Sequence, residues 1–212
     1  MDNKLRLRFS KTDKLRFIGH LDFLRVFQQM IRRSGLPIAY SQGFNPHQIV
    51  SFALPLPLGM ESIHDYADVT LTANLPADEI VNSLNDAAPQ GLRILAAYPV
   101  QGANAAAATI AADYVIHCDG ALDLQPAIEK IMQSETLIIP KKTKSGIKNT
   151  DIRPDIFTIE ATEAGLQMRL SAGSARFLNP LLVAQQIFET VPQAISRVEL
   201  YQSDGTGAFK PL

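Results

Sequence analysis

The chain has 212 residues, of which 46% are hydrophobic and 19% charged, and its formal net charge is −1. This composition is typical of a folded protein with one large or two small domains, and it excludes a chain that is disordered throughout. The sequence has no apolar run of about 18 residues, no secretory signal and a single cysteine, Cys118. We therefore expect a cytoplasmic protein without a membrane span or an internal disulfide.

The first hundred residues alternate between strand and helix patterns. Lys4–Phe9 alternates apolar and polar side chains, which predicts a half-buried strand. Apolar residues recur at helical spacing from His20 to Ser34, and Gly35 followed by Pro37 ends that helix. Further segments complete the β-α-β-β-α-β order of ferredoxin-like folds: strands at Ile49–Leu54, Tyr66–Leu71 and Leu92–Tyr98, and a helix at Pro76–Ala88.

The second half repeats this order with variations. Gln101–Ala108 (QGANAAAA) is either a linker or the start of an alanine-rich helical turn. We predict an α+β fold of two tandem ferredoxin-like (β-α-β-β-α-β) halves, with domains at 1–100 and 109–212, each an antiparallel sheet with helices on one face. The later segments are strands at Asp113–Cys118, Leu137–Ile139, Phe157–Ala161, Leu166–Leu170 and Ile195–Tyr201, and helices at Asp123–Ser134 and from Pro180 to Val191, the latter capped by Asn179.

Positive charge is concentrated at the start of the chain. Residues 1–50 carry nine Lys/Arg against three Asp/Glu, whereas residues 51–100 carry one against six. Arg25, Gln29 and Arg32 fall on one line of the first predicted helix, and Arg33 follows them. This helix face is either simply solvated or contacts phosphate groups together with the basic residues that precede the helix: Lys11, Lys14 and Arg16.

An aromatic loop follows the helix. Tyr40–His47 (YSQGFNPH) contains glycine and an Asn-Pro pair, both typical of turns. Tyr40, Phe44 and His47 could offer rings to single-stranded nucleic acid, which is bound by stacking rings beside cations. Alternatively, Phe44 fills the core beneath a tight turn.

The segment Leu54–Gly59 (LPLPLG) is apolar and interrupted by prolines. Because Pro55 and Pro57 cannot donate hydrogen bonds to a strand ladder, the segment is an edge strand or an extended loop. It is either a docking surface for a partner protein or a buried exit from a strand.

A second basic cluster spans Lys141–Arg153 (KKTKSGIKNTDIR). Its Ser-Gly centre predicts a hairpin or a loop. The cluster is either a solvated loop or a site for phosphate or an RNA backbone, formed by Lys141, Lys142, Lys144, Lys148 and Arg153.

Motifs of catalysis are missing from the sequence. It has no P-loop, no dinucleotide-binding glycine fingerprint, no HExxH pair and no nucleophile elbow. The four histidines are widely separated, so we expect no metal and no cofactor. His20 and His47 are the candidates for acid–base catalysis, and Cys118 is predicted to lie inert within a strand.

Four motifs together resemble one family. They are RFIGHLDFLR, RRSGLPIAYSQGFNPH, LPLGMES and KKTKSG followed by DIRP. They resemble the radical-SAM-linked proteins, an uncharacterised bacterial family of stand-alone partners or C-terminal extensions of B12-binding-type radical SAM proteins. One departure is that Gln48 and Ile49 follow His47, where the family has a further proline and a basic residue.

The resemblance implies an accessory role beside a radical SAM protein. The chain lacks the three cysteines that would hold a radical SAM cluster, so it is not itself the radical enzyme. Our leading hypothesis is a non-catalytic accessory protein that binds RNA, either tRNA or rRNA, through its basic clusters. The alternatives are a subunit that binds the radical SAM partner without nucleic acid and, as a weaker hypothesis, an RNA-processing or other His-dependent enzyme.

Overall fold

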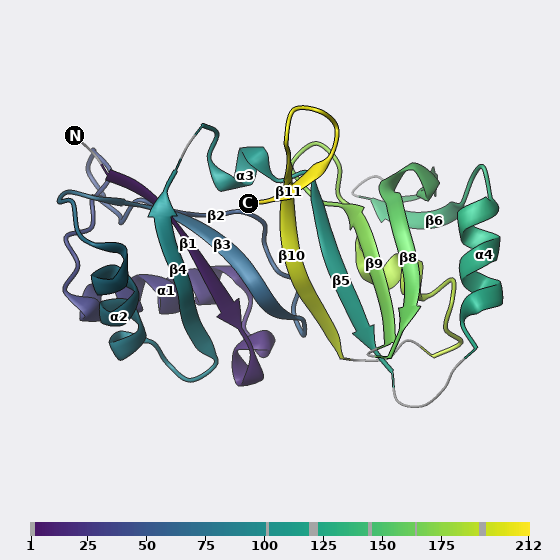
Figure 1. Ribbon diagram of the computed structural model, residues 1–212, viewed down its shortest axis with the longest axis horizontal. Helices are drawn as coiled ribbons and strands as arrows, with labels where there is room; N and C mark the ends of the chain where they lie inside the picture. The colour runs from purple at the N-terminus through teal and green to yellow at the C-terminus, as the bar shows by residue number, and fades with distance from the viewer. Residues whose placement is uncertain (1–2, 101, 119–122, 144–145, 164, 191–193) are drawn as a thin grey trace.

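The computed structural model describes residues 3–100, 102–118, 123–143, 146–163, 165–190 and 194–212. One large sheet crosses the whole molecule in the order β4-β1-β3-β10-β5-β9-β8 (Figure 1). Five α-helices and a separate two-stranded sheet, β6-β7, accompany it in these ranges. The fold is therefore a mixed α/β architecture built on a mostly antiparallel sheet with few helices.

The first half follows the predicted order of elements. Its strands are β1 (Asn3–Lys11), β2 (Val50–Phe52), β3 (Glu61–Leu71) and β4 (Leu92–Pro99), and its helices are α1 (His20–Ser34) and α2 (Ala77–Ala87). A short 3-10 helix, η1 (Asp13–Phe17), joins β1 to α1. One hydrophobic cluster lies between both helices and the strands β1, β3 and β4, with Leu7, Phe9, Phe27 and Ile80 almost fully buried.

The second half contains every strand and helix predicted for it and adds further elements. Its strands are β5 (Ala111–His117), β6 (Ile138–Thr143), β7 (Gly146–Asp151), β8 (Ile156–Thr162), β9 (Gly165–Ser171), β10 (Ile195–Ser203) and β11 (Phe209–Pro211). Its helices are α3 (Ala105–Ala108), α4 (Gln125–Gln133) and α5 (Pro180–Ala184), with a 3-10 turn, η2 (Arg153–Asp155). A tandem pair of ferredoxin-like units is not confirmed.

The prediction of a separate sheet for each half is wrong. β10 pairs with β5 on one side and, in parallel, with β3 on the other, through Ser196 opposite Glu61 and Arg197 opposite Ser62. The last long strand of the second half thus joins both halves into a single sheet (Figure 1).

Three smaller predictions are resolved by the structure. The helical alternative for the alanine-rich segment is confirmed, because α3 forms there and buries Ala105. Asn179 caps α5 as predicted, its side chain accepting from the Leu181 amide at 3.0 Å, but α5 ends at Ala184 instead of Val191. Cys118 follows the end of β5 and is half-buried, so it does not lie within a strand.

Candidate nucleic-acid interface

Helix α1 presents a basic face to solvent. Its apolar residues pack against the sheet and are buried. Gly35 ends the helix in a left-handed conformation with φ of 71°. The opposite face exposes Arg25, Gln29, Arg32 and Arg33. Arg25 pairs with Asp22 at 2.8 Å, and Arg33 donates to a carbonyl oxygen of α2. These exposed arginines are available to a ligand, since surface ion pairs contribute little to stability.

The aromatic loop projects from the fold on a closed base. The Ser41 amide donates to the His47 carbonyl at 2.8 Å, and the Ser41 hydroxyl lies 2.8 Å from His47 Nδ1. The interpretation in which Phe44 fills the core is wrong, because its side chain is fully exposed (106%). Tyr40 is 44% exposed and His47 is exposed. A ring held in water on a closed loop can stack on another ring.

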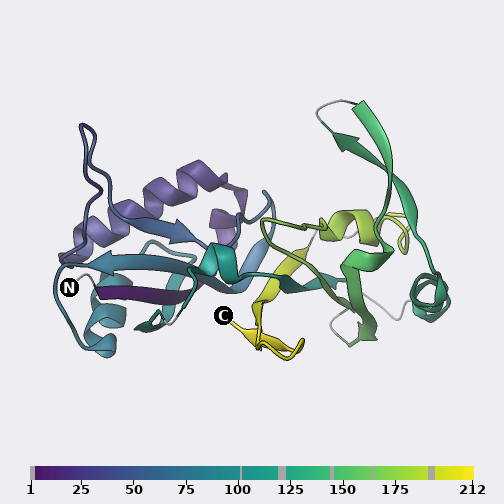
Figure 2. The same ribbon diagram turned by 90° about the horizontal axis from the view of Figure 1, so that it is seen from above.

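The predicted lysine loop is a long hairpin. β6 and β7 pair in antiparallel register, with Lys141 opposite Lys148 and Lys142 opposite Ile147. Lys148 and Ile147 are exposed on β7, and Lys144 lies outside the described residues. Figure 2 shows this hairpin and the aromatic loop projecting on the same side of the sheet, at opposite ends of the molecule. The two clusters therefore do not merge into one patch, and α1 and α5 lie between them on that side.

Arg153 has a structural role. Its guanidinium donates to the carbonyl oxygens of Met132, Ser134 and Ile156 at 2.9–3.2 Å. A guanidinium held by three carbonyls fixes the start of β8 against the end of α4 and has few donors left for a phosphate.

The basic residues before α1 divide between surface and interior. Lys14 is exposed. Arg16 stacks on Phe17 at 4.7 Å and pairs with Glu61 at 3.4 Å. Lys11 is only 2% exposed, and its ammonium group donates to the Ile18 carbonyl at 3.2 Å. Desolvation lowers the pKa of Lys11 from its usual value, and only part of that effect is offset by Asp65.

The histidines do not converge. His20 is the first residue of α1 and packs edge-on against Phe52 at 5.7 Å, while the helix is capped by Gly19. His47 belongs to the aromatic loop. Among the described residues, no group of three or more His, Cys, Asp or Glu side chains is placed to hold a metal ion.

A buried ion pair joins the halves, and the sequence analysis missed it. Arg197 on β10 is fully buried and donates to Asp65 on β3 at 2.6 Å and to the Leu54 carbonyl at 3.0 Å. Desolvation raises the pKa of Asp65, and the charges of Arg197 and Lys11 offset part of the rise. We call this ion pair, together with the parallel β3–β10 pairing, the seam. Every second residue of β1 points into the core, and Lys11 continues the buried series of Leu7 and Phe9. The sequence therefore contained one signal that Lys11 is buried.

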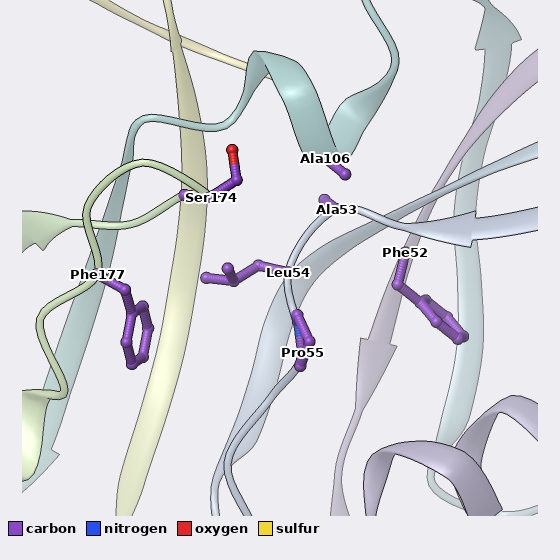
Figure 3. A pocket seen from close by; sticks show the side chains of 8 residues that line it. Phe52, Ala53, Leu54, Pro55, Ala106, Ser174 and Phe177 are labelled. Atoms are coloured by element: carbon purple, nitrogen blue, oxygen red, sulfur yellow. The ribbon is translucent and has the colours of Figure 1, made fainter. Parts of the chain in front are cut away.

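An apolar pocket of about 410 Å³ also lies where the halves meet. Its walls come from the end of β2 and the chain after it, from α3 and from the loop between β9 and α5 (Figure 3). Pro55 and Pro57 lie in an extended loop, so of the two predicted alternatives, an edge strand and an extended loop, the second is confirmed. Pro55 also lines this pocket.

The comparisons with known proteins give a family but no activity. Residues 4–180 match the family described as "Uncharacterized protein conserved in bacteria (DUF2344)". The chain therefore belongs to this uncharacterised bacterial family. No curated protein matches the chain. No helix in the described ranges is long and apolar enough to cross a membrane.

Proposed function

We propose that this protein of the uncharacterised bacterial family is a non-catalytic RNA-binding accessory protein. The RNA would lie on the side of the sheet that carries α1, with the aromatic loop at one end and the lysine hairpin at the other. The motif resemblance adds the proposal that the RNA, a tRNA or rRNA, is presented to a radical SAM partner.

The observation that carries this proposal is the fully exposed ring of Phe44, in a loop that projects on the same side of the sheet as the basic hairpin (Figure 2). Exposed apolar rings are costly in water, and a base that stacks on one contributes about 1–3 kcal/mol. Arg32 and Lys148 supply charge from α1 and from the hairpin, both exposed. Such cations bind the phosphate backbone by releasing counterions, so affinity falls with salt.

The test is the fluorescence anisotropy of labelled bulk tRNA at about 50 and 200 mM salt. We expect micromolar binding that weakens steeply with salt. Replacing Arg32→Gln and Lys148→Gln should lower the salt slope by about 0.7–0.9 for each lost contact. Phe44→Ala should weaken binding about tenfold at both salt concentrations, because stacking does not depend on counterions.

The matched control is Arg93→Gln. Arg93 is an exposed arginine on β4 between Leu92 and Ile94, which both point into the helix-side core, so Arg93 faces away from α1. Its loss should leave the affinity unchanged. Binding that is absent at low salt would refute the proposal.

A second candidate function is protein interaction without nucleic acid. Phe17, Leu21 and Leu58 are 61%, 68% and 67% exposed, and a 2.8 Å hydrogen bond from the Gly59 amide to the Arg16 carbonyl brings the loop that carries Leu58 to η1. Exposed apolar side chains that gather in this way are typical of docking sites. Co-purification with the radical SAM partner after nuclease treatment, lost on Leu58→Glu, would favour this candidate.

A further inference from the structure

The pocket between the halves lies on the proposed RNA-binding side. Phe52 belongs to the aromatic cluster beneath α1, where it packs against Phe23 and Phe27, and Phe177 precedes α5. α1 and α5 both stand on the side from which the aromatic loop and the hairpin project (Figure 2). An RNA strand that spans these two projections therefore passes over the pocket.

The walls of the pocket are fixed by the fold. On one wall, the carbonyl oxygens of Leu54 and Pro55 accept hydrogen bonds from the buried Arg197. On the other, Gly173 lies so close to Thr109 that a Cβ there would be 2.3 Å from the Thr109 carbonyl oxygen. This close approach holds the loop that carries Ser174 and Phe177 against the sheet. The pocket is thus formed before any ligand arrives, which lowers the entropic cost of binding.

The chemistry of the lining suits a flat ring with a polar edge. Phe177, Leu54 and Pro55 offer apolar surfaces, and Ser174, an exposed residue of the lining, adds a hydroxyl that points away from these three side chains (Figure 3). The volume of about 410 Å³ falls in the range of about 300–1,000 Å³ that is usual for ligand sites. A base can place its two faces against the apolar walls and keep its hydrogen-bonding edge toward Ser174 and solvent, so no polar group is buried without a partner.

We infer that this pocket receives one unpaired base of the bound RNA. The inference rests on the proposed function and adds to it the class of ligand, which is single-stranded RNA or an unpaired loop. A base inside a duplex is stacked and paired. It could reach the pocket only if it were extruded from the duplex, which costs free energy.

The experiment compares three labelled RNAs: an unstructured 12-nucleotide oligo(A), the matching oligo(U) and a duplex of the two. Phe177→Ala removes one wall of the pocket, and Ala106→Leu fills the pocket from α3. Each variant should weaken binding of the single strands about tenfold, as expected for one lost stacking contact, and leave duplex binding unchanged. Oligo(U) that carries 4-thiouridine should also crosslink, on irradiation, to the peptide that contains Phe177.

Phe157 provides a closely matched control. Phe157 and Phe177 are 38% and 37% exposed. Phe157, however, packs against Phe209 and is not part of the hydrophobic core cluster, although the preceding residue, Ile156, is. Phe157→Ala should leave single-strand binding unchanged. If both pocket variants bind single strands as tightly as the unmodified protein while Phe44→Ala still weakens binding, the inference of a base pocket is overturned and the proposed function stands. Absence of RNA binding in the unmodified protein would overturn both.

Discussion

Asp65→Asn should destabilise the protein strongly through the seam. The substitution keeps the shape of the side chain and removes its charge, so Arg197, which is 0% exposed, loses its carboxylate partner at 2.6 Å. Removing one member of a buried pair costs about 3–5 kcal/mol, because the other charge stays desolvated. For a chain of this size that corresponds to a fall in Tm of about 6–20 °C.

The assay is urea unfolding followed by circular dichroism, together with a thermal melt. The matched control is Asp22→Asn, whose pair with Arg25 has the same chemistry but side chains 64% and 72% exposed. That control should cost less than about 1 kcal/mol. The double change Asp65→Leu with Arg197→Met should recover part of the stability, since it removes both members of the pair, although the buried Lys11 then loses the charge of Asp65. Equal losses for Asp65→Asn and Asp22→Asn would refute the reasoning.

Three further predictions concern single residues. Arg153→Ala should lower stability by about 1–3 kcal/mol in denaturant unfolding and leave the RNA affinity of the folded protein unchanged; a selective loss of affinity would contradict its structural role. Gly165→Ala should destabilise by about 1–3 kcal/mol or more, since φ is +124° and the new Cβ would be 2.1 Å from the Ile116 carbonyl oxygen; unchanged stability would show that the hairpin relaxes freely. Burial and a 2.8 Å hydrogen bond to Asp113 raise the pKa of Tyr201 to about 12, so its stabilising contribution is full below about pH 10 and is lost as the pH rises toward 12. The difference in unfolding free energy between the unmodified protein and Tyr201→Phe should therefore shrink from pH 8 to pH 11.5, and a constant difference would argue against this.

Local signals predicted the elements better than their arrangement. α1 begins and ends at the predicted residues, because an apolar stripe, a following glycine and a proline all act within a few positions. β2 is shorter and β3 longer than predicted. The pairing of β10 with β3 joins residues more than 130 positions apart. The apolar pattern of a strand predicts the strand but does not indicate which strand it pairs with. One sheet and two sheets were equally compatible with that pattern.

The candidate interface was predictable to a similar degree. Exposure of the α1 arginines and of the hairpin follows from charge patterning, whereas the full exposure of Phe44 does not, because aromatic residues beside glycine pack inward at least as readily. Lys11 was assigned to the basic surface although it continues the inward series of β1. The pocket had no sequence signal, since its walls come from segments that meet only through the tertiary fold.

The placement of β10 governs the order in which the sheet can be completed during synthesis. β3 and β5 are made early, and β2 covers residues 67–69 of β3, yet one edge of β3 at Glu61 and Ser62 and one edge of β5 stay unpaired until residues 195–203 have left the ribosome. Exposed edges of this kind pair readily with other chains, and pairing between distant segments is slow. The centre of the sheet is therefore its last part to form, and the nascent protein should depend most on chaperones after β9 is complete and before β10 inserts.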